Sequence, residues 1–295
     1  MVKVLIAGGS GFIGRHLVQH LKKQGYSVSL LSRTMQIIDG FDECIIWQEV
    51  TTAKIIQFDV VINLCGFGIG EKRWCKSIKE KILSSRIEPT ERLIKHIADH
   101  DVWLINASAI GYYPFSLKEQ NETEIIQRTK ANSGFCQYIV NQWEAVVNRS
   151  RLRRKTIVRF GVVLGKGGML SKLLPTAKVG LAATIGNGQQ IMSWVHIDDL
   201  CRAMVFILEQ QCINIEINMT SDNACSQKVF IKTMAKVLNK PCFLVLPQWL
   251  VRLIFGQMGK ELLLSSHNIK PMRLQDAGFI FDYPHIETAL IDLLK

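Results

Sequence analysis

Three glycines spaced three residues apart, Gly8, Gly11 and Gly14, stand between an apolar run and an amphipathic segment near the start of the chain. Residues 2–7 are apolar and partly β-branched, which predicts a buried strand, whereas apolar residues recur at helical spacing through residues 12–23. In such a unit the first glycine permits a sharp turn, the second lets the backbone approach a pyrophosphate, and the third lets the helix pack on the strand. The helix N-terminus adds unpaired N–H groups. This predicts a nucleotide-binding loop made of Gly8, Gly9, Ser10, Gly11, Phe12, Ile13 and Gly14.

The order of the other predicted elements favours a parallel sheet. Strands are expected at residues 26–31, 59–64, 102–106 and 156–160, and helices at residues 74–99 and 135–149. Strands that alternate with helices at this spacing form an α/β fold, a Rossmann-type doubly wound parallel sheet with right-handed crossovers. We expect residues 1–165 to form this nucleotide-binding domain, with part of residues 195–220 returning to the sheet.

The pattern changes beyond residue 165. Glycines space out a stretch that we expect to be rich in loops, and helices are predicted at residues 199–209, 226–238 and 287–294. Residues 166–295 are therefore predicted to form a smaller, mainly helical lobe beside the sheet.

The residues after the second predicted strand bear on the choice of cofactor. A site that selects NAD(H) usually places Asp or Glu there, hydrogen-bonded to the ribose 2′-hydroxyl. Ser32 and Arg33 stand at this point instead, and a guanidinium can stack on adenine and pair with a 2′-phosphate. The sequence favours NADP(H) over NAD(H); the alternative is an exposed Arg33 that binds no ligand.

The composition indicates which kinds of partner and which cellular compartment to expect. Of the 295 residues 36 are basic and 25 acidic, a formal net charge of +11, yet the densest basic cluster, at residues 149–155, lacks interleaved aromatic residues. We therefore expect a small-molecule substrate and no nucleic acid. The eight cysteines include no Cys-x-x-Cys pair, which predicts reduced thiols and no metal site. No apolar run reaches the roughly 18 residues that a membrane helix needs, so we expect a cytoplasmic protein with no membrane partner. The oligomeric state stays open.

Motifs along the chain resemble those of one enzyme family. They are Gly8-x-x-Gly-x-x-Gly14, Ile62-Asn-Leu-Cys-Gly66, Lys72-Arg-Trp74, Ser85-Arg86 with Thr90, Ser108-Ala-Ile-Gly-Tyr-Tyr113, Trp143-Glu144, Arg159-Phe-Gly-Val-Val-Leu-Gly165, Trp194-Val-His-Ile-Asp-Asp199 and, in the tail, Pro271-Met-Arg-Leu274. In this order they cover essentially the whole chain, and they resemble the atypical epimerase family of the extended short-chain dehydrogenase/reductases.

The resemblance implies NADP(H) binding and an oxidoreductase or epimerase activity, without naming a substrate. It also implies that residues 245–293 form a family-specific C-terminal domain of unknown function. The cofactor-binding residues that its motifs imply outside the glycine loop, from the adenosine end to the nicotinamide end, are Ser32, Arg33, Leu64, Cys65, Gly66, Arg86, and the backbone at Gly161 and Val162.

The proton-transfer residues that are usual in the wider superfamily are only partly present. In that superfamily a Ser orients the carbonyl, and a Tyr and a Lys four residues apart on one helix carry the proton. Ser108 stands at the serine position, but no Tyr in the chain is followed four residues later by Lys. If Glu144 is matched to the acidic residue that often follows the Lys by four positions, the pair would fall on Cys136 and Val140. Tyr138 and Gln142 imitate the spacing, but on another face of the helix.

Other side chains remain as candidates for catalysis. We predict Ser108 and Tyr112 as hydroxyl donors, with Arg73 or Lys79 engaging an anionic substrate. The alternatives are a tyrosine that only packs and basic side chains on a solvated helix face. His196 suggests an acid–base group, although a structural role is favoured.

Two functions follow from these observations. The first is an NADP(H)-dependent oxidoreductase or epimerase acting by hydride transfer on a small substrate, which a phosphate or a nucleotide would make anionic. The second is a non-catalytic NADP(H)-binding module whose cofactor state governs a partner interaction. The nucleotide loop supports the first, which is the function that we predict, and the absence of the Tyr–Lys pair counts against it. That absence supports the second, for which the basic surface leaves room for an acidic partner.

Overall fold

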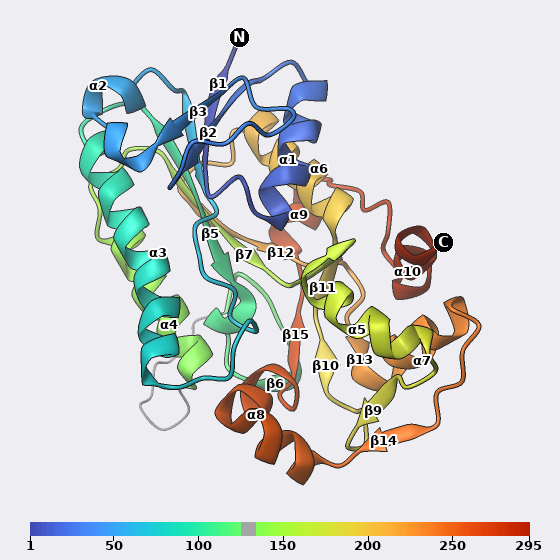
Figure 1. The fold of residues 1–295 in the computed structure, drawn as a ribbon. Coiled ribbons are helices and arrows are strands. Elements are labelled where there is room, and N and C mark those ends of the chain that lie inside the picture. The colour runs from blue at the N-terminus through green and yellow to red at the C-terminus, as the bar shows by residue number, and fades with distance from the viewer. Residues whose placement is uncertain (125–133) are drawn as a thin grey trace.

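The computed structural model describes residues 1–124 and 134–295 of the chain. Its centre is a seven-stranded parallel sheet with the order β12-β7-β5-β4-β1-β2-β3 (Figure 1). The strands of this sheet are β1 (Lys3–Ala7), β2 (Ser27–Ser32), β3 (Glu43–Ile46), β4 (Val60–Asn63), β5 (Trp103–Ala109), β7 (Lys155–Phe160) and β12 (Ile215–Met219). The chain order reverses between β1 and β4, so the crevice at the carboxyl ends of these two strands is the expected ligand site.

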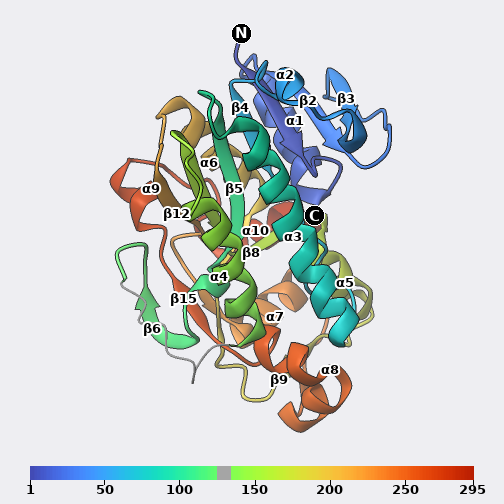
Figure 2. The ribbon, with the colours of Figure 1, turned by 90° about the vertical axis from the view of Figure 1, so that its left-hand side faces the viewer.

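Helices cover both faces of the sheet, because the strands bury side chains on both sides. In β1, Val4 and Ile6 belong to one core cluster and Leu5 and Ala7 to the other, and all four are fully buried. The helices are α1 (Phe12–Lys23) and α6 (Ile197–Glu209), which pack together, and α3 (Lys76–Ile97) and α4 (Phe135–Asn148), which pack together on the opposite face (Figures 1 and 2). The predicted Rossmann-type doubly wound sheet is confirmed.

The structure contains elements that the sequence pattern did not indicate. Strand β3 extends the sheet beyond β2. The stretch after residue 165, expected to be rich in loops, contains helix α5 (Gly168–Lys178), so that expectation was wrong there. The glycines mark the ends of this helix: Gly168, with a φ of +58°, turns the chain into it, and Gly180, with a φ of +81°, follows its last turn.

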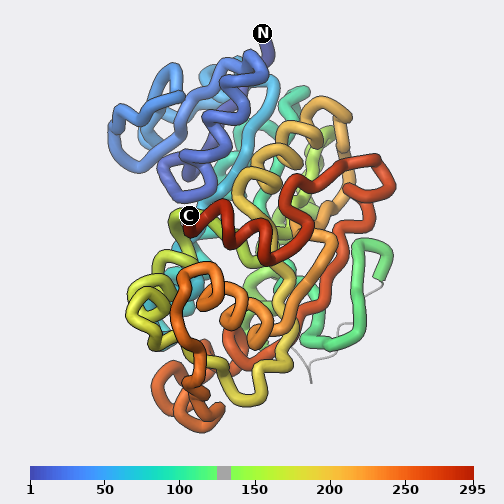
Figure 3. Tube along the Cα trace, turned by 90° about the vertical axis from the view of Figure 1, so that its right-hand side faces the viewer, coloured from blue at the N-terminus to red at the C-terminus, as the bar shows by residue number. Residues whose placement is uncertain are grey.

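A smaller lobe lies below the sheet in Figure 1. Its elements are α5, α7 (Gln227–Val237), α8 (Gln248–Leu262), the parallel pair β9 (Ala183–Ile185) and β14 (Leu244–Leu246), and the antiparallel pair β10 (Ile191–Met192) and β13 (Cys225–Ser226). Helix α8 is kinked at Gly256, which has a φ of +57°. Helix α10 (Ile286–Leu294) packs on α7 and lies between α6 and α7 in Figure 3.

The fold also contains shorter elements outside the central sheet and its main helices. They are β8 (Val162–Gly165) paired with β11 (Trp194–His196), β6 (Ser116–Gln120) paired with β15 (His267–Ile269), the helices α2 (Thr52–Ile55) and α9 (Met272–Asp276), and the 3-10 turns Trp47–Glu49 and Ile110–Tyr112. None of the helices in the described ranges is long and apolar enough to cross a membrane.

Candidate active site

The predicted nucleotide loop joins β1 to α1 and needs glycine at two of its positions. Gly8 has a φ of +75°, and a Cβ atom there would lie 3.0 Å from the Cys65 main-chain nitrogen. A Cβ atom on Gly14 would lie 2.3 Å from the Gly9 carbonyl oxygen, so the helix could not pack this close to the loop. The first main-chain bond of α1 runs from the Arg15 N–H to the Gly11 carbonyl, 3.1 Å, which leaves the preceding amides available for an anion.

A cavity of about 820 Å³ opens at this loop and extends between the sheet and the lobe. Of the predicted cofactor-binding residues, those that line it are Gly8, Gly11, Phe12, Ile13, Gly14, Leu64, Cys65, Gly66, Arg86, Gly161 and Val162. The structure thus brings together segments far apart in the sequence at the carboxyl ends of the strands. Gly9, Ser10, Ser32 and Arg33 stand outside the lining.

Arg86, on α3, presents a part-buried guanidinium to this cavity. Its Nη1 donates to the carbonyl oxygens of Phe67 and Ile82 at 3.0 and 2.8 Å, and the group lies over the Trp143 ring, 5.4 Å from its centroid. Burial lowers the pKa of Arg86 to about 10, and no carboxylate of the described residues offsets it. A buried cation without an anionic partner is costly, so this position suits a negatively charged ligand.

Ser32 is the last residue of β2, and Arg33 follows it. The Ser32 hydroxyl accepts a hydrogen bond from the Gln36 amide at 2.7 Å, and the Arg33 side chain is exposed. Arg33 lies near enough to Cys65 to act on that thiol, although burial is the larger effect and raises the pKa of Cys65 to about 12. An exposed guanidinium at the rim of the crevice can reach a ligand without losing an existing partner.

The backbone at Gly161 and Val162 is already hydrogen-bonded. The Gly161 N–H donates to Met219 and the Val162 N–H to Ser193, at 3.0 and 2.9 Å. These amides are therefore not free donors, and an approaching ligand would meet the Cα surface and the carbonyl groups of this segment. A Cβ atom on Gly161 would lie 2.9 Å from the Ser193 carbonyl oxygen, which explains the glycine.

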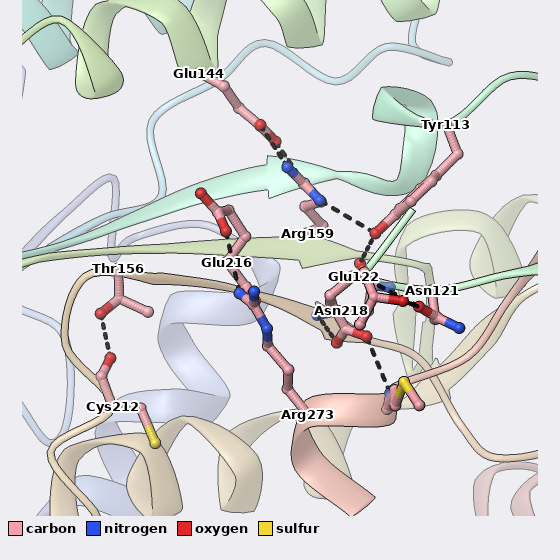
Figure 4. Close-up of polar contacts among 12 residues, drawn as sticks. Tyr113, Asn121, Glu122, Glu144, Thr156, Arg159, Cys212, Glu216, Asn218 and Arg273 are labelled. Carbon is pink, nitrogen blue, oxygen red and sulfur yellow. Dashed lines mark hydrogen bonds and ion pairs between the residues drawn. The ribbon is translucent and has the colours of Figure 1, made fainter. Parts of the chain in front are cut away.

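Ser108 lines the cavity, but its hydroxyl is committed to a buried network. Ser108 Oγ donates to Glu144 Oε1 at 2.6 Å, and Arg159 binds both oxygens of Glu144 at 2.8 Å (Figure 4 shows the Glu144–Arg159 contact). Arg159 Nη1 continues to the Tyr113 hydroxyl, which donates to Asn218 Oδ1 at 3.0 Å. In this arrangement the Ser108 proton points to Glu144 and not to a substrate.

Charge and burial act in opposite directions on the pKa values of this network. Burial opposes ionisation of Arg159, but the hydrogen bonds and the charge of Glu144 raise the pKa of Arg159 above its ordinary value. Burial is also the main cause that raises the pKa of Tyr113 to about 12. The pairing of Arg159 with Glu144 could not be predicted from sequence, because the two residues lie on different elements 15 positions apart.

The other predicted catalytic side chains stand outside the cavity lining. The Tyr112 ring packs against the Arg159 guanidinium, 3.5 Å from carbon to ring centroid. Lys79 Nζ donates to Gln257 Oε1 at 2.6 Å and lies over the Phe135 ring, and Arg73 is exposed beside Gly256. The structure therefore does not bring Tyr112, Arg73 and Lys79 together with Ser108 at one point of the cavity.

Helix α4 presents Cys136 and Val140 to the cavity, whereas Tyr138 is 48% exposed. Glu261, a buried residue of α8, caps this helix: its two carboxylate oxygens accept the N–H groups of Phe135 and Cys136 at 3.0 and 2.8 Å. Burial and the adjacent Glu261 charge raise the pKa of the Cys136 thiol well above its ordinary value. The C-terminal lobe thus contributes a carboxylate to the wall of the cavity, which no spacing in the sequence indicated.

His267, the first residue of β15, is a second contribution of the lobe to the cavity. Its Nδ1 is shielded from solvent and has no hydrogen-bond partner among the described residues, and the Phe115 ring packs edge-on against it at 5.0 Å. Burial alone lowers the pKa of His267 to about 4. The imidazole is therefore neutral near pH 7 and offers one N–H donor and one acceptor.

The His267 pKa predicts a contribution to acid sensitivity. Between about pH 6.5 and pH 4 the unfolded chain binds a proton at His267 that the folded protein excludes, so stability falls as the pH falls through this window. We expect His267→Gln to flatten the decline by up to about 3 kcal/mol, measured by urea unfolding at pH 7 and pH 4.5. Equal declines in the variant and the parent protein would contradict the assignment.

The contacts of His196 are those of a structural residue. Its Nδ1 accepts the Asp198 N–H at 3.1 Å, its ring stacks on Tyr283 with centroids 3.9 Å apart, and its Nε2 lies 3.3 Å from Asp292 Oδ2. His196, Asp198 and Asp292 lie close enough together to suggest a metal site. However, a neutral imidazole that accepts at Nδ1 carries its proton at Nε2, which leaves no lone pair there for a metal ion.

Comparison with known proteins places these features in a family. Residues 4–218 match the model of the NAD dependent epimerase/dehydratase family, and residues 246–293 match a domain of unknown function, DUF1731. The chain is 33% identical to the epimerase family protein ML0860 of Mycobacterium leprae, over 97% of this chain and 94% of that protein. It is 30% identical to the epimerase family protein SDR39U1 of Bos taurus, over 99% of this chain and the whole of the relative.

Solved structures agree with the fold. The crystal structure of human epimerase family protein SDR39U1 with NADPH superposes with a TM-score of 0.86 at 28% identity, covering 99% of each chain. The UDP-N-acetylglucosamine 4-epimerase of Bacillus cereus superposes with a TM-score of 0.73, at 18% identity, and at that level supports the fold alone.

Proposed function

This chain belongs to the NAD dependent epimerase/dehydratase family, as its motifs indicated, and on that premise we propose that it binds NADP(H) and acts as an oxidoreductase on a small molecule. The observation that carries the proposal is the part-buried Arg86 guanidinium, which faces the cavity beside the glycine loop without an anionic partner. A dinucleotide supplies the negative charge that this position lacks.

The residues of the cavity fit this cofactor. The loop from Gly8 to Gly14 would hold the pyrophosphate on the first turn of α1, with Arg86 nearby. Ser32 and Arg33 would hold the adenosine end, and Leu64, Cys65 and Gly66 would lie along the cofactor. NADP(H) is favoured over NAD(H) because Arg33 stands where a carboxylate would repel a 2′-phosphate, and because the human relative was solved with NADPH.

NADP(H), when bound, supplies or accepts a hydride. The chain's own part is to hold that cofactor, shield the reacting centre from water and bind the substrate oxygen. Cys136 and Val140, the positions at which the sequence motifs would put the usual Tyr–Lys pair, line the cavity wall. The proton that the substrate oxygen gains or loses must therefore move through another group or through water.

A non-catalytic NADP(H)-binding module is the second candidate. The commitment of the Ser108 hydroxyl to Glu144 favours it, since that side chain then gives nothing to a substrate. Against it stands the depth of the cavity, which continues past the glycine loop into the lobe and leaves room for a second molecule.

Fluorescence titration of the purified protein with NADPH and NADH tests the cofactor assignment. We expect NADPH to bind at least tenfold more tightly than NADH, and Arg33→Ala to remove most of that preference, because a charge-assisted contact to phosphate contributes about 1.5–3 kcal/mol. Arg151→Ala, an exposed arginine outside the cavity, is the matched control. Binding of neither nucleotide would overturn the proposal, and equal binding of both would overturn the preference for NADP(H).

A further inference from the structure

Resting on this proposed function, we propose that the lobe side of the cavity binds the apolar body of a lipophilic aldehyde or ketone, and that His267 hydrogen-bonds its carbonyl oxygen. This substrate class differs from a nucleotide sugar, which carries charged phosphates and many hydroxyl groups.

The side chains that the lobe contributes to the cavity are mostly apolar. They come from α5, α7, β14 and α8, so four separate elements line the same part of the cavity with apolar side chains. The largest of them are Met169, Leu173, Phe230, Met234, Leu246 and Phe255. Apolar surface that faces a cavity is stabilised when an apolar ligand covers it.

The polar side chains on this side are largely engaged by the protein. Gln227 accepts the Ile185 N–H and donates to the Ala183 carbonyl, and Gln190 donates to the carbonyls of Ile185 and Leu263. Glu261 is used in capping α4. These groups shape the wall and leave little hydrogen-bonding capacity for a sugar.

His267 is the exception among these polar side chains. Its imidazole lines the cavity and makes no side-chain hydrogen bond with the described residues. It is close to the segment assigned to the nicotinamide end, because Ser193 Oγ donates to the His267 carbonyl at 2.8 Å while the Ser193 carbonyl accepts the Val162 N–H at 2.9 Å. A neutral imidazole can donate to a carbonyl oxygen and polarise it.

The distribution of cationic side chains in the cavity also favours an uncharged substrate. Arg86 is the one Lys or Arg among the described lining residues, and the proposed function assigns it to the cofactor. A second diphosphate in the lobe would thus meet apolar walls without a counter-charge, at a high cost of desolvation. An uncharged substrate avoids that cost.

The reaction that this substrate class implies is reduction of the carbonyl group to an alcohol, or the reverse oxidation. In the reducing direction the carbonyl carbon gains a hydride from NADPH, the carbonyl oxygen gains a proton from water, and the C=O group becomes a CH–OH group as NADPH is oxidised to NADP⁺. His267 remains neutral throughout and serves as the hydrogen-bond donor to the oxygen.

Calorimetric titration of the NADP⁺-loaded protein with 2-alkanones of increasing chain length tests the apolar subsite. We expect the affinity to rise roughly fourfold per added methylene, the increment for burying one CH₂ group, and UDP-glucose not to bind. Phe255→Ala should weaken the longest ketone about tenfold or more, whereas Leu253→Ala, on the same helix but 65% exposed and outside the lining, should not. Affinity independent of chain length, or tighter binding of UDP-glucose, would overturn the proposal.

His267 is tested by comparing ketones with alkenes of equal length. We expect His267→Phe to weaken ketone binding about tenfold while alkene binding is retained, and His267→Gln, which keeps a donor, to restore most of the loss. Equal losses for both ligands would show a merely structural His267. Because NADP⁺ binding is measured first, loss of the cofactor site and loss of the ketone site are separate results: NADP⁺ binding without any ketone binding overturns this inference and leaves the proposed function standing.

Discussion

Gly14→Ala is expected to destabilise the protein by about 3 kcal/mol and to abolish NADPH binding. The added methyl group would lie 2.3 Å from the Gly9 carbonyl oxygen and 2.4 Å from the Gly9 Cα atom. Both contacts are with backbone, so no side-chain rotation relieves them, and α1 must move away from the loop that it supports. Urea unfolding and NADPH titration of the same preparation measure the two effects.

Gly11→Ala separates cofactor binding from folding and is the matched control. At Gly11 the backbone has a φ of −76° and a ψ of 177°, which any residue adopts, and a Cβ atom would approach only the Gly8 carbonyl oxygen, at 3.4 Å. We expect unchanged stability, since alanine also restricts the unfolded chain, but at least tenfold weaker NADPH binding because the methyl group stands where the pyrophosphate approaches. Normal NADPH affinity in both glycine variants would contradict the assignment of the loop.

Arg159→Met is expected to lower the free energy of unfolding by about 3–5 kcal/mol. The Glu144 carboxylate would stay buried at 2% exposure without its cation, and Tyr113 would lose a donor. Chemical denaturation of the variant measures this loss. Arg159→Met combined with Glu144→Leu should recover part of it, because a buried apolar pair carries no desolvation penalty.

The exposed pair of Lys236 and Glu287 provides the comparison. Its 2.9 Å contact is nearly as short as the 2.8 Å contact of the buried pair, but both partners lie on the surface. Glu287→Gln should leave the unfolding midpoint unchanged, since solvent screens such pairs. If Arg159→Met and Glu287→Gln had similar effects, the buried network would not be the strong element that its geometry indicates.

Local patterns predicted most of the sheet and the glycine loop that lines one end of the cavity. The glycine loop, the buried strands and the helices between them each leave a signal within one short segment, because strand, turn and helix periodicities are local. The rim residues Ser32 and Arg33 follow from the same reasoning. Strand β3 was not predicted, because it is an edge strand of only four residues, Glu43–Ile46.

The lobe side of the cavity could not be predicted, because its parts come from distant segments. Glu261 reaches the N-terminus of α4 across about 125 positions, and His267 enters the cavity through the pairing of β15 with β6. Arg159 and Glu144 meet only when β7 and α4 pack. Arg73, Lys79 and Tyr112 were chosen for residue type and nearness in sequence to Ser108, and neither property fixes where a side chain points.

Hydrogen–deuterium exchange with and without NADPH tests most directly whether the glycine loop holds this cofactor. We predict slower exchange in residues 8–14 and 64–68 on NADPH addition, because the first amides of α1 gain phosphate acceptors that the protein does not provide. Residues 286–294 of α10, which lie outside the cavity lining, should exchange at an unchanged rate. NADPH that protects another surface, or none, would contradict the account.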